Sequence, residues 1–375
     1  GCESLLEVDS SIFLLQKLQV LHIGRCTSLK SLSSNTCSPV LTELNAWNCI
    51  NLQEFSVTFA SVDGLALGLT KWNGNELSSS ILHKKNLRCF YFPLIECLVD
   101  LPENFANYIW LESPLNLEHD PFITLRKLLS SPAFISLKHL TLANIPILSE
   151  IPDNFSLLAS LESLTLIDIA IRSLPETKYL PRLNWLRVYG CKMLQSIPAL
   201  SQYIPFFVVW NCESLQTVLS STCQHDKPNP CFTVLLNCQN LDPQSYHAIL
   251  KDAIDGIELV ARKISKIEED DIIEYLLPVM PGGEYWFHYR STQVSFTLEL
   301  PPNLLGFVYY LVLSQGHMNQ CVGFGCDCYL ANSSGESIYI TSYTRAEMID
   351  YLGDDSDTKI RMESDHVLLW YDPVI

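Results

Sequence analysis

The chain has 375 residues, 48% of them hydrophobic, and its 24 Lys and Arg against 41 Asp and Glu give a formal net charge of −17. This composition excludes an intrinsically disordered chain. The acidic balance argues against nucleic acid and anionic membrane surfaces as partners, because both would repel the protein. The charge is uneven, since residues 1–219 carry a net −4 and residues 220–375 a net −13, which predicts a domain boundary near residue 220.

Neither the N-terminus nor the longest uncharged stretch reads as a targeting or membrane segment. Gly1 is not a start methionine, and Glu3 precedes any apolar run, which does not fit a signal peptide. We therefore expect the chain to be a piece of a longer protein. Residues 300–326 carry no Asp, Glu, Lys or Arg, but they include Pro301, Pro302 and several amides, so we expect no membrane span.

A repeat of the form L-x-x-L-x-L organises residues 1–219. The clear units begin at Leu18, Leu41, Leu87, Leu137, Leu161, Leu183 and Ile204, and the last four begin 24, 22 and 21 residues apart. The two longer gaps predict further units at Val62 and around Leu115 and Leu117. This is the spacing of leucine-rich repeats, in which a short strand and an irregular return stack on their neighbours into one continuous core.

Six cysteines each precede a leucine by three residues, in the slot where leucine-rich repeats hold Asn or Cys: Cys2, Cys26, Cys49, Cys191, Cys212 and Cys238. Side chains in that slot point inward after the strand. We therefore predict buried, reduced thiols at these positions and no disulfides.

The alternating positions of the repeat strands predict the residues of the concave face. Aromatic residues together with an Arg are typical of protein-binding surfaces, and the alternative is that some of them pack against a returning segment of the same chain. The candidate protein-binding residues are Trp47, Tyr91, His139, Trp185, Arg187, Tyr189, Phe206 and Trp210. Smaller residues expected on the same face include Thr141, Ser163 and Thr165.

The segment after the repeats begins with a strand and continues as a helix. Residues 232–236 are predicted to form the strand of a terminal cap. Asp242 followed by Pro243 is typical of a helix start, and apolar residues at helical spacing extend to Ile267. The acidic run at 268–271 is predicted to end this helix, so residues 220–272 are interpreted as a cap strand and an amphipathic helix linker.

Residues 273–375 are predicted to form strands. Alternation covers 294–300, a continuous apolar run at 307–313 suggests a strand buried on both faces, and further strands are expected at 321–330, 337–343 and 366–371. Turn residues at 332–335 and 353–356 separate them. Short strands without a long helix indicate a β-sandwich.

Short motifs along the chain resemble those of one protein family. Leu-Pro or Ile-Pro pairs trail four repeats, at 101–102, 151–152, 174–175 and 197–198, and Asn237-Cys238 is followed by Leu241-Asp242. These features are similar to the repeats, and the segment closing them, of plant intracellular immune receptors of the Toll/interleukin-1-receptor (TIR) type. The runs at 276–278, 281–284, 286–287, 291–292 and 298–301, and residues 364–371, resemble the start and the final strand of their C-terminal jelly-roll/Ig-like domain. Tyr285 stands where the family usually has Ile-Pro, so we expect a shortened first loop.

The resemblance implies an α/β leucine-rich-repeat solenoid over residues 1–219, with parallel strands on its concave face. It implies a cap strand and a helix at 220–272, and an all-β jelly-roll/Ig-like sandwich at 273–375. In this family these parts bind a pathogen effector protein and restrain the receptor. The upstream nucleotide-binding part exchanges ADP for ATP, and the TIR domain consumes NAD.

The partners so implied are an effector and the receptor's own upstream nucleotide-binding and TIR domains, with oligomerisation only in the activated full-length receptor. No G-x-x-x-x-G-K-[ST] loop occurs in this sequence. We therefore expect no enzyme activity and no cofactor in this chain. The expected location is the cytoplasm, with the nucleus as a second compartment.

Other chemistry fits the residues less well. The spacing of Cys223, His225, Cys231 and Cys238 matches no common zinc pattern, so we expect no metal. Two alternative functions stay open at this point. A secreted or cell-surface repeat receptor would carry disulfide-paired caps, and a carbohydrate-active β-sandwich enzyme would need a pocket with paired carboxylates.

Overall fold

The structure is a computed structural model of the whole chain. It describes residues 1–72, 81, 87–94, 98, 101, 103–113, 120–199, 204–219, 231–263, 273–280, 287, 289–293, 295, 297, 299, 306–318, 321–331, 337–347 and 360–373. The chain divides into two compact units, Gly1–Gln202 and Tyr203–Ile375, which we call the first and the second unit. The domain limits expected from the sequence, at 219 and 272, stay predictions.

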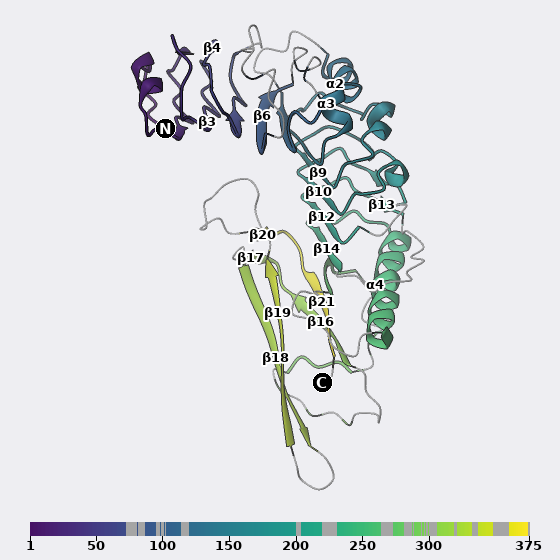
Figure 1. Cartoon of the computed structure of the whole chain (residues 1–375). Coiled ribbons are helices and arrows are strands. Elements are labelled where there is room, and N and C mark those ends of the chain that lie inside the picture. Colours follow the sequence, from purple (N-terminus) through teal and green to yellow (C-terminus); the bar gives the residue numbers. More distant parts are fainter. Residues whose placement is uncertain are drawn as a thin grey trace. The chain divides into compact units, whose positions relative to one another are not determined.

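The first unit is built on a sheet of parallel strands (Figure 1). In sheet order these strands are β1 (Val20–His22), β3 (Glu43–Asn45), β5 (Gly64–Ala66), β6 (Cys89–Pro93), β7 (Tyr108–Glu112), β8 (His139–Ala143), β9 (Ser163–Ile167) and β10 (Trp185–Tyr189). One apolar residue of each strand lies in register with the next across the whole sheet: Leu21, Leu44, Leu65, Phe90, Ile109, Leu140, Leu164 and Leu186. All of these side chains are buried. Leucine spacing therefore gives the expected strand stacking, because each repeat buries its apolar residues against its neighbours.

The returns between these strands are short and mostly irregular. They hold the short strands β2 (Ser31–Ser33) and β4 (Glu54–Ser56) and the 3-10 helices η3 (Asp153–Leu157) and η4 (Thr177–Tyr179). The 3-10 helix η1 (Ser10–Leu14) precedes β1, and the short strand β11 (Ser196–Ile197) follows β10. The return between β7 and β8 is helical, with α2 (Pro121–Leu129) and α3 (Pro132–Ile135), which lie in a layer apart from strands β8 to β10 (Figure 1). Asp120 caps α2 by accepting a hydrogen bond from the Phe122 amide, 2.9 Å away.

One repeat strand lies elsewhere than the sequence suggested. The strand between β6 and β8 is β7 at Tyr108–Glu112, with Ile109 and Leu111 in the leucine slots, whereas the unit was expected around Leu115 and Leu117. Those two leucines lie outside the described residues. The error has a physical cause: Ala106 occupies the first slot of this repeat and pairs with Leu87. The small apolar residue fits the core but hides the leucine pattern.

A left-handed backbone turn follows eight of the repeat strands, four residues after the central apolar position. The residues with positive φ are Arg25, Asn48, Leu69, Asn144, Asp168, Gly190, Asn211 and Asn237. Gly, Asn and Asp tolerate this conformation, which explains most of these residues. The two exceptions are Arg25, at φ 62°, and Leu69, at φ 53°.

The cysteine slot follows this turn directly. Cys26, Cys49, Cys191, Cys212 and Cys238 are buried and free, as predicted, whereas Cys2 is exposed. The thiol of Cys49 donates to the carbonyl oxygen of Ile23 at 3.2 Å. Burial raises the pKa of the Cys191 and Cys238 thiols to about 12. These thiols therefore stay protonated and pack in the hydrophobic core.

The second unit continues with strands of the same type and then changes direction. Parallel pairing joins β12 (Phe206–Trp210), β14 (Cys231–Leu236) and β15 (Ile273–Pro278), and antiparallel pairing adds β21 (His366–Pro373) and β16 (Gly306–Leu313). The strand expected at 232–236 is thus confirmed as part of β14. The short strand β13 (Thr217–Val218) precedes it along the chain.

Helix α4 (Pro243–Lys263) begins where the sequence predicted. Asp242 accepts a hydrogen bond from the Ser245 amide at 2.7 Å, and this contact lowers the pKa of its carboxyl. The helix buries Tyr246, Leu250 and Ala253 along one face. Its described part ends at Lys263, and residues 264–272 lie outside the described residues.

The remaining strands form ribbons. β17 (Gly316–Met318) pairs with β20 (Ile360–Met362), and β18 (Cys321–Ala331) pairs with β19 (Ser337–Glu347). The strands expected near 321–330, 337–343 and 366–371 are present, but the β-sandwich arrangement stays a prediction. Ser295, Thr297 and Glu299, the described residues of the strand expected at 294–300, do not lie in one. The turns at 332–335 and 353–356 lie outside the described residues.

The strand at 307–313 forms as β16 but is not buried on both faces. Val308, Leu311 and Val312 are exposed, with 51% of the Val312 surface accessible. β16 ends the order of hydrogen-bonded strands in the described sheet. An apolar run therefore marked an edge strand here, because hydrophobicity alone does not reveal how many neighbours a strand has.

Candidate protein-binding face

The strand face of the first unit carries three rows of side chains, because every second residue of a strand points to the same side. The rows follow the register across β6 to β10. The first row holds Tyr108, His139, Ser163 and Trp185, the second Tyr91, Trp110, Thr141, Thr165 and Arg187, and the third Pro93, Glu112, Ala143, Ile167 and Tyr189. The structure therefore places Tyr91, His139, Trp185, Arg187 and Tyr189 on one face, as the sequence predicted.

The three rows differ in exposure. The third row, at the carboxyl ends of the strands, is fully buried, and this includes Tyr189 at 7% accessible surface. Tyr189 was expected to be exposed, and this expectation is wrong. Strand alternation tells which face a residue points to, but it cannot tell where along the strand that face becomes covered.

The small polar residues of this face were also expected to be exposed and are buried. Thr141, Ser163 and Thr165 lie between larger residues of the same rows. The Tyr108 hydroxyl and the Thr141 hydroxyl are 3.0 Å apart and share a hydrogen bond. On this face the short polar side chains are thus buried, whereas the aromatic side chains of the first two rows are partly exposed.

An aromatic cluster occupies strands β6, β7 and β8. The Tyr91 ring lies 5.5 Å from Tyr108, edge to face, and 5.4 Å from Trp110. The Tyr108 ring lies 6.3 Å from His139. Tyr91, Tyr108, Trp110 and His139 are all partly buried, so each keeps part of its surface accessible to solvent. Such rings offer apolar area at low cost in side-chain entropy.

This cluster is uncharged near neutral pH. Burial raises the pKa of Tyr91 to about 12 and raises the pKa of Tyr108 further. Burial also lowers the pKa of His139. Glu162 opposes this shift, whereas the neighbouring Lys138 and Arg187 add to it. The cluster therefore offers uncharged ring surfaces and hydroxyl groups on this face.

Arg187 places a positive charge on this face. Its guanidinium carbon lies 4.5 Å from the centre of the Trp185 ring on the same strand, a cation–π contact. Arg187 also lies close enough to Tyr108 and His139 to influence the pKa values of both. A guanidinium stacked on Trp and bordered by aromatic rings has the chemistry of an interface anchor.

A buried carboxyl lies at the end of β7. The indole N–H of Trp110 donates to Oε1 of Glu112 at 2.8 Å, and Oε2 receives no hydrogen bond from any described residue. Burial raises the pKa of Glu112, while the indoles of Trp110 and Trp47 oppose that shift. A Cβ atom added to Gly68 would lie 2.9 Å from Cδ1 of Trp47 and 3.1 Å from Oε2 of Glu112. Gly68 is therefore needed for the close approach of these two residues.

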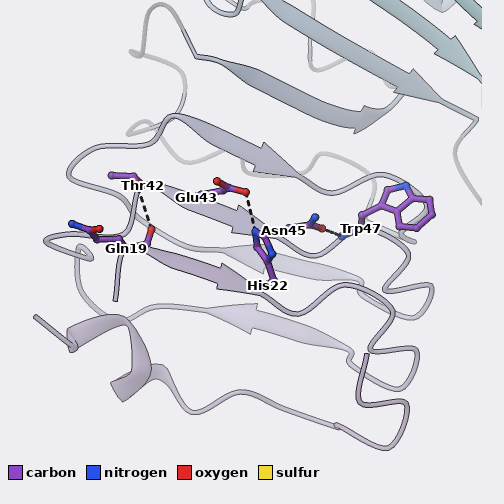
Figure 2. Close-up of polar contacts among 6 residues, drawn as sticks. All are labelled: Gln19, His22, Thr42, Glu43, Asn45 and Trp47. Carbon is purple, nitrogen blue, oxygen red and sulfur yellow. Dashed lines mark hydrogen bonds and ion pairs between the residues drawn. The ribbon is translucent and has the colours of Figure 1, made fainter. Parts of the chain in front are cut away.

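Trp47, a candidate protein-binding residue from the sequence, lies near several polar side chains of the first repeats (Figure 2). Its amide donates to Oδ1 of Asn45 at 2.9 Å, and Arg25 lies 5.9 Å from its ring centre. On the neighbouring strands β1 and β3, Nε2 of His22 and Oε1 of Glu43 lie 2.8 Å apart. This part of the face is more polar than the cluster on β6 to β8.

Phe206 and Trp210 lie on β12 of the second unit. The Phe206 ring is 6.5 Å from Phe232. Trp210 packs against a buried cluster that contains residues from β14, β15, β20 and β21, namely Val234, Leu236, Leu276, Ile360, Met362, Leu368 and Trp370. For Trp210 the alternative reading holds, since the side chain packs against a returning segment of its own chain.

Sequence reasoning missed Tyr108, Trp110 and Glu112 because it did not find their strand. The signal was present as alternation in Tyr108-Ile109-Trp110-Leu111-Glu112, with apolar residues at the two inward positions. This pattern predicts a half-buried strand even where the leucines of the repeat are replaced.

Other kinds of site find little support in the described residues. No group of three or more His, Cys, Asp or Glu side chains able to hold a metal occurs among them. Residues 220–230, which contain Cys223 and His225, lie outside the described residues. Within the described helices, none has an apolar stretch long enough to cross a bilayer.

Comparison with known proteins points to one biological context. No protein-family profile matches the chain. The chain is 25% identical over 382 aligned residues to the disease resistance-like protein DSC1 of Arabidopsis thaliana, and the alignment covers 97% of this chain and 29% of DSC1. It is 28% identical over 207 aligned residues to the disease resistance-like protein CSA1 of the same plant, covering 51% of this chain and 16% of CSA1. The chain thus spans less than a third of the length of these curated relatives. The chain is thus similar to plant disease resistance-like proteins over nearly its whole length.

Proposed function

We propose that this chain is the ligand-sensing, C-terminal part of an intracellular plant immune receptor and that it binds a pathogen effector protein. The observation that carries this proposal is the strand face of the first unit, where an aromatic cluster stands beside Arg187 stacked on Trp185. Partly buried aromatic rings with an Arg anchor are typical of protein-binding hot spots. The similarity to disease resistance-like proteins supplies the biological context.

The proposed mechanism is recognition without covalent chemistry. The effector covers the rings of Tyr91, Trp110 and Trp185, and Arg187 contacts a carboxylate or carbonyl group of the effector. In the resting receptor the same face helps to restrain the upstream nucleotide-binding and TIR domains. An effector shifts that balance only as far as it binds the active arrangement more tightly than the resting one.

The proposed partners follow from this role. They are an effector protein and the receptor's own upstream domains, with assembly into oligomers only in the complete activated receptor. Nucleic acid and membranes are not partners in this proposal, consistent with the net charge of −17. Nucleotide exchange and NAD consumption belong to the upstream domains, and this chain works in the cytoplasm or the nucleus.

The test expresses the complete receptor in leaves together with a panel of secreted pathogen proteins and records the local cell-death response. The double variant Trp185→Ala/Arg187→Ala removes the stacked pair. A matched control exists in the return that precedes β10, where the Lys178 ammonium lies 4.9 Å from the centre of the Tyr179 ring on η4. The control variant is therefore Lys178→Ala/Tyr179→Ala.

We expect a pathogen protein that triggers wild type to fail with the first variant and to act fully on the control, at equal receptor abundance. The loss corresponds to roughly 30-fold or more in affinity, because two hot-spot residues each contribute about 1 kcal/mol or more. A full response of the first variant to every triggering protein would contradict the proposal.

A further inference from the structure

The hydrogen-bond ladder of the repeats ends at Asn237, and its last donor needs an acceptor. After most repeat strands, the amide of the residue with positive φ donates to a carbonyl oxygen of the next repeat. The recorded pairs are Arg25 to Trp47, Asn48 to Gly68, Asn144 to Ile167, Asp168 to Tyr189 and Asn211 to Leu236, all between 2.8 and 3.0 Å. Asn237 has the same backbone conformation, with φ 55°. Its amide instead donates to Nε2 of His366, 3.1 Å away.

His366 thus supplies the hydrogen-bond acceptor that a backbone carbonyl of the next repeat supplies at the other turns. It is the first residue of β21, and it is separated from Asn237 by 129 positions in the sequence. A buried backbone N–H without an acceptor would be costly, so the ring nitrogen completes the ladder. An imidazole differs from a carbonyl in one respect, which is that it can take up a proton.

The hydrogen bonds assign the tautomer of His366. A backbone amide can only donate, so Nε2 must be the unprotonated, accepting nitrogen. The other nitrogen, Nδ1, lies 2.8 Å from the carbonyl oxygen of Ser364 and donates to it. His366 is therefore neutral in this arrangement, with its proton on Nδ1.

The Asn237 side chain also forms hydrogen bonds with the segment that leads to His366. Its Nδ2 donates to the carbonyl oxygen of Arg361 and to Oδ1 of Asn211, both at 2.8 Å. Its Oδ1 accepts from the Glu363 amide at 2.9 Å. The amide orientation follows from these partners, since two of them are carbonyl oxygens and one is an N–H. Asn237 thus binds the segment 361–366 through backbone and side chain.

The surroundings of the imidazole favour its neutral form. His366 is fully buried, and it pairs with Pro278 on β15 and Leu313 on β16. Burial lowers its pKa, and the Ser364 carbonyl and Asp365 only partly oppose this shift. The other charged residues on the adjoining elements are Arg361 and Glu363, both exposed, and the buried Glu274 on β15.

We propose that Asn237 and His366 form a proton-sensitive latch, in which neutral His366 closes the repeat ladder and holds residues 360–366, and protonated His366 releases them. Protonation places an N–H at Nε2 against the N–H of Asn237 and puts a charge in an apolar site. The bond between them is lost. The segment 360–366 then keeps the Asn237 side-chain bonds, the pairing of β20 with β17, the bonds of Asp365 to the Val279 and Gln315 amides, and Ile360 and Met362 in the buried cluster.

Hydrogen exchange of the whole chain, measured as protection factors between pH 7.5 and 5.0, tests this latch. We expect protection of residues 360–370 to fall at least tenfold more than that of β9 and β10. His366→Gln offers an acceptor for the Asn237 amide and does not titrate, so its protection should not change over this range. Asn240→Ala, which removes an exposed contact to the Glu213 carbonyl in the same turn, should behave as wild type.

Two results would overturn the proposal. One is wild-type protection of 360–370 that is constant down to pH 5.0, or that falls only together with β9 and β10. The other is independent of any variant: nitrogen NMR of the wild-type imidazole at pH 7.5 should show the proton of His366 on Nδ1. A proton on Nε2 would exclude the bond on which the latch depends.

Discussion

The guanidinium of Arg187 stacks on Trp185 two residues earlier on β10, at 4.5 Å from the ring centre, while Tyr189 two residues later is buried. All three side chains point to the same face of the sheet. The face therefore changes from partly exposed surface to core within a single strand.

This change predicts different costs for two neighbouring substitutions. Arg187→Ala should lower the free energy of unfolding by about 1 kcal/mol or less, since a partly exposed cation–π contact contributes no more than that. Tyr189→Ala should cost about 3 kcal/mol, because it removes a buried ring. Urea unfolding of the two variants measures both values. Equal costs would mean that the division between surface and core is misplaced.

The turn position after each strand predicts a stabilising substitution at Leu69. Its φ of 53° costs a Leu roughly 1–2 kcal/mol, and Asn accepts this conformation more readily. Leu69→Asn should therefore raise the free energy of unfolding by about 1 kcal/mol. The reverse change at the equivalent position, Asn144→Leu at φ 53°, should lower it by a similar amount. A destabilised Leu69→Asn protein would show that the Leu side chain contributes more by packing than its backbone costs.

The buried carboxyl of Glu112 predicts a pH-dependent gain from Glu112→Gln. The folded-state pKa is raised, so the folded protein binds the proton more tightly than the unfolded chain. The wild-type destabilisation is therefore absent below the unfolded pKa of 4.5 and develops as pH rises through the folded pKa. Gln keeps an acceptor for the Trp110 indole and carries no charge.

Glu112→Gln should consequently be more stable than wild type at pH 7, by about 1.4 kcal/mol for each unit by which the pKa is raised, and equal to it near pH 4. Thermal unfolding at both pH values measures this difference. Glu103→Gln is the control, since that side chain is exposed. A Glu112→Gln protein less stable than wild type at pH 7 would contradict the inferred cost of the buried charge.

The cysteine slot predicts two classes of thiol. Cys2 and Cys37 are exposed and should react with iodoacetamide in the native protein. Cys191 and Cys238 are buried with pKa values of about 12, so they should react only after denaturation. Mass spectrometry of labelled peptides separates the two classes. Rapid native labelling of Cys191 would show that the repeat core opens easily.

The strands of the first unit could be predicted where leucines fill the slots. β8, β9 and β10 each carry the full spacing, and their leucines face the core as expected. β7 could not be placed by spacing because Ala106 and Ile109 replace leucines. Core positions need apolar volume rather than one residue type, so repeats lose their sequence pattern before they lose their packing.

The parts of the site that depend on distant segments could not be read from the sequence. Trp210 alternates correctly on β12, but β20 and β21, more than a hundred residues later, supply the cluster against which it packs. The bond from Asn237 to His366 is of the same kind. Local periodicity gives the direction of a side chain, whereas what covers it depends on tertiary contacts.

The central claim is that the strand face of the first unit binds the effector. Oxidative footprinting of Trp110 and Trp185 in the complete receptor, alone and with a pathogen protein that triggers it, tests this claim directly. The account predicts that both tryptophans become protected while the exposed Tyr179 on η4 stays as reactive as before. Unchanged labelling of Trp110 and Trp185, with protection appearing only in residues 203–375, would contradict it.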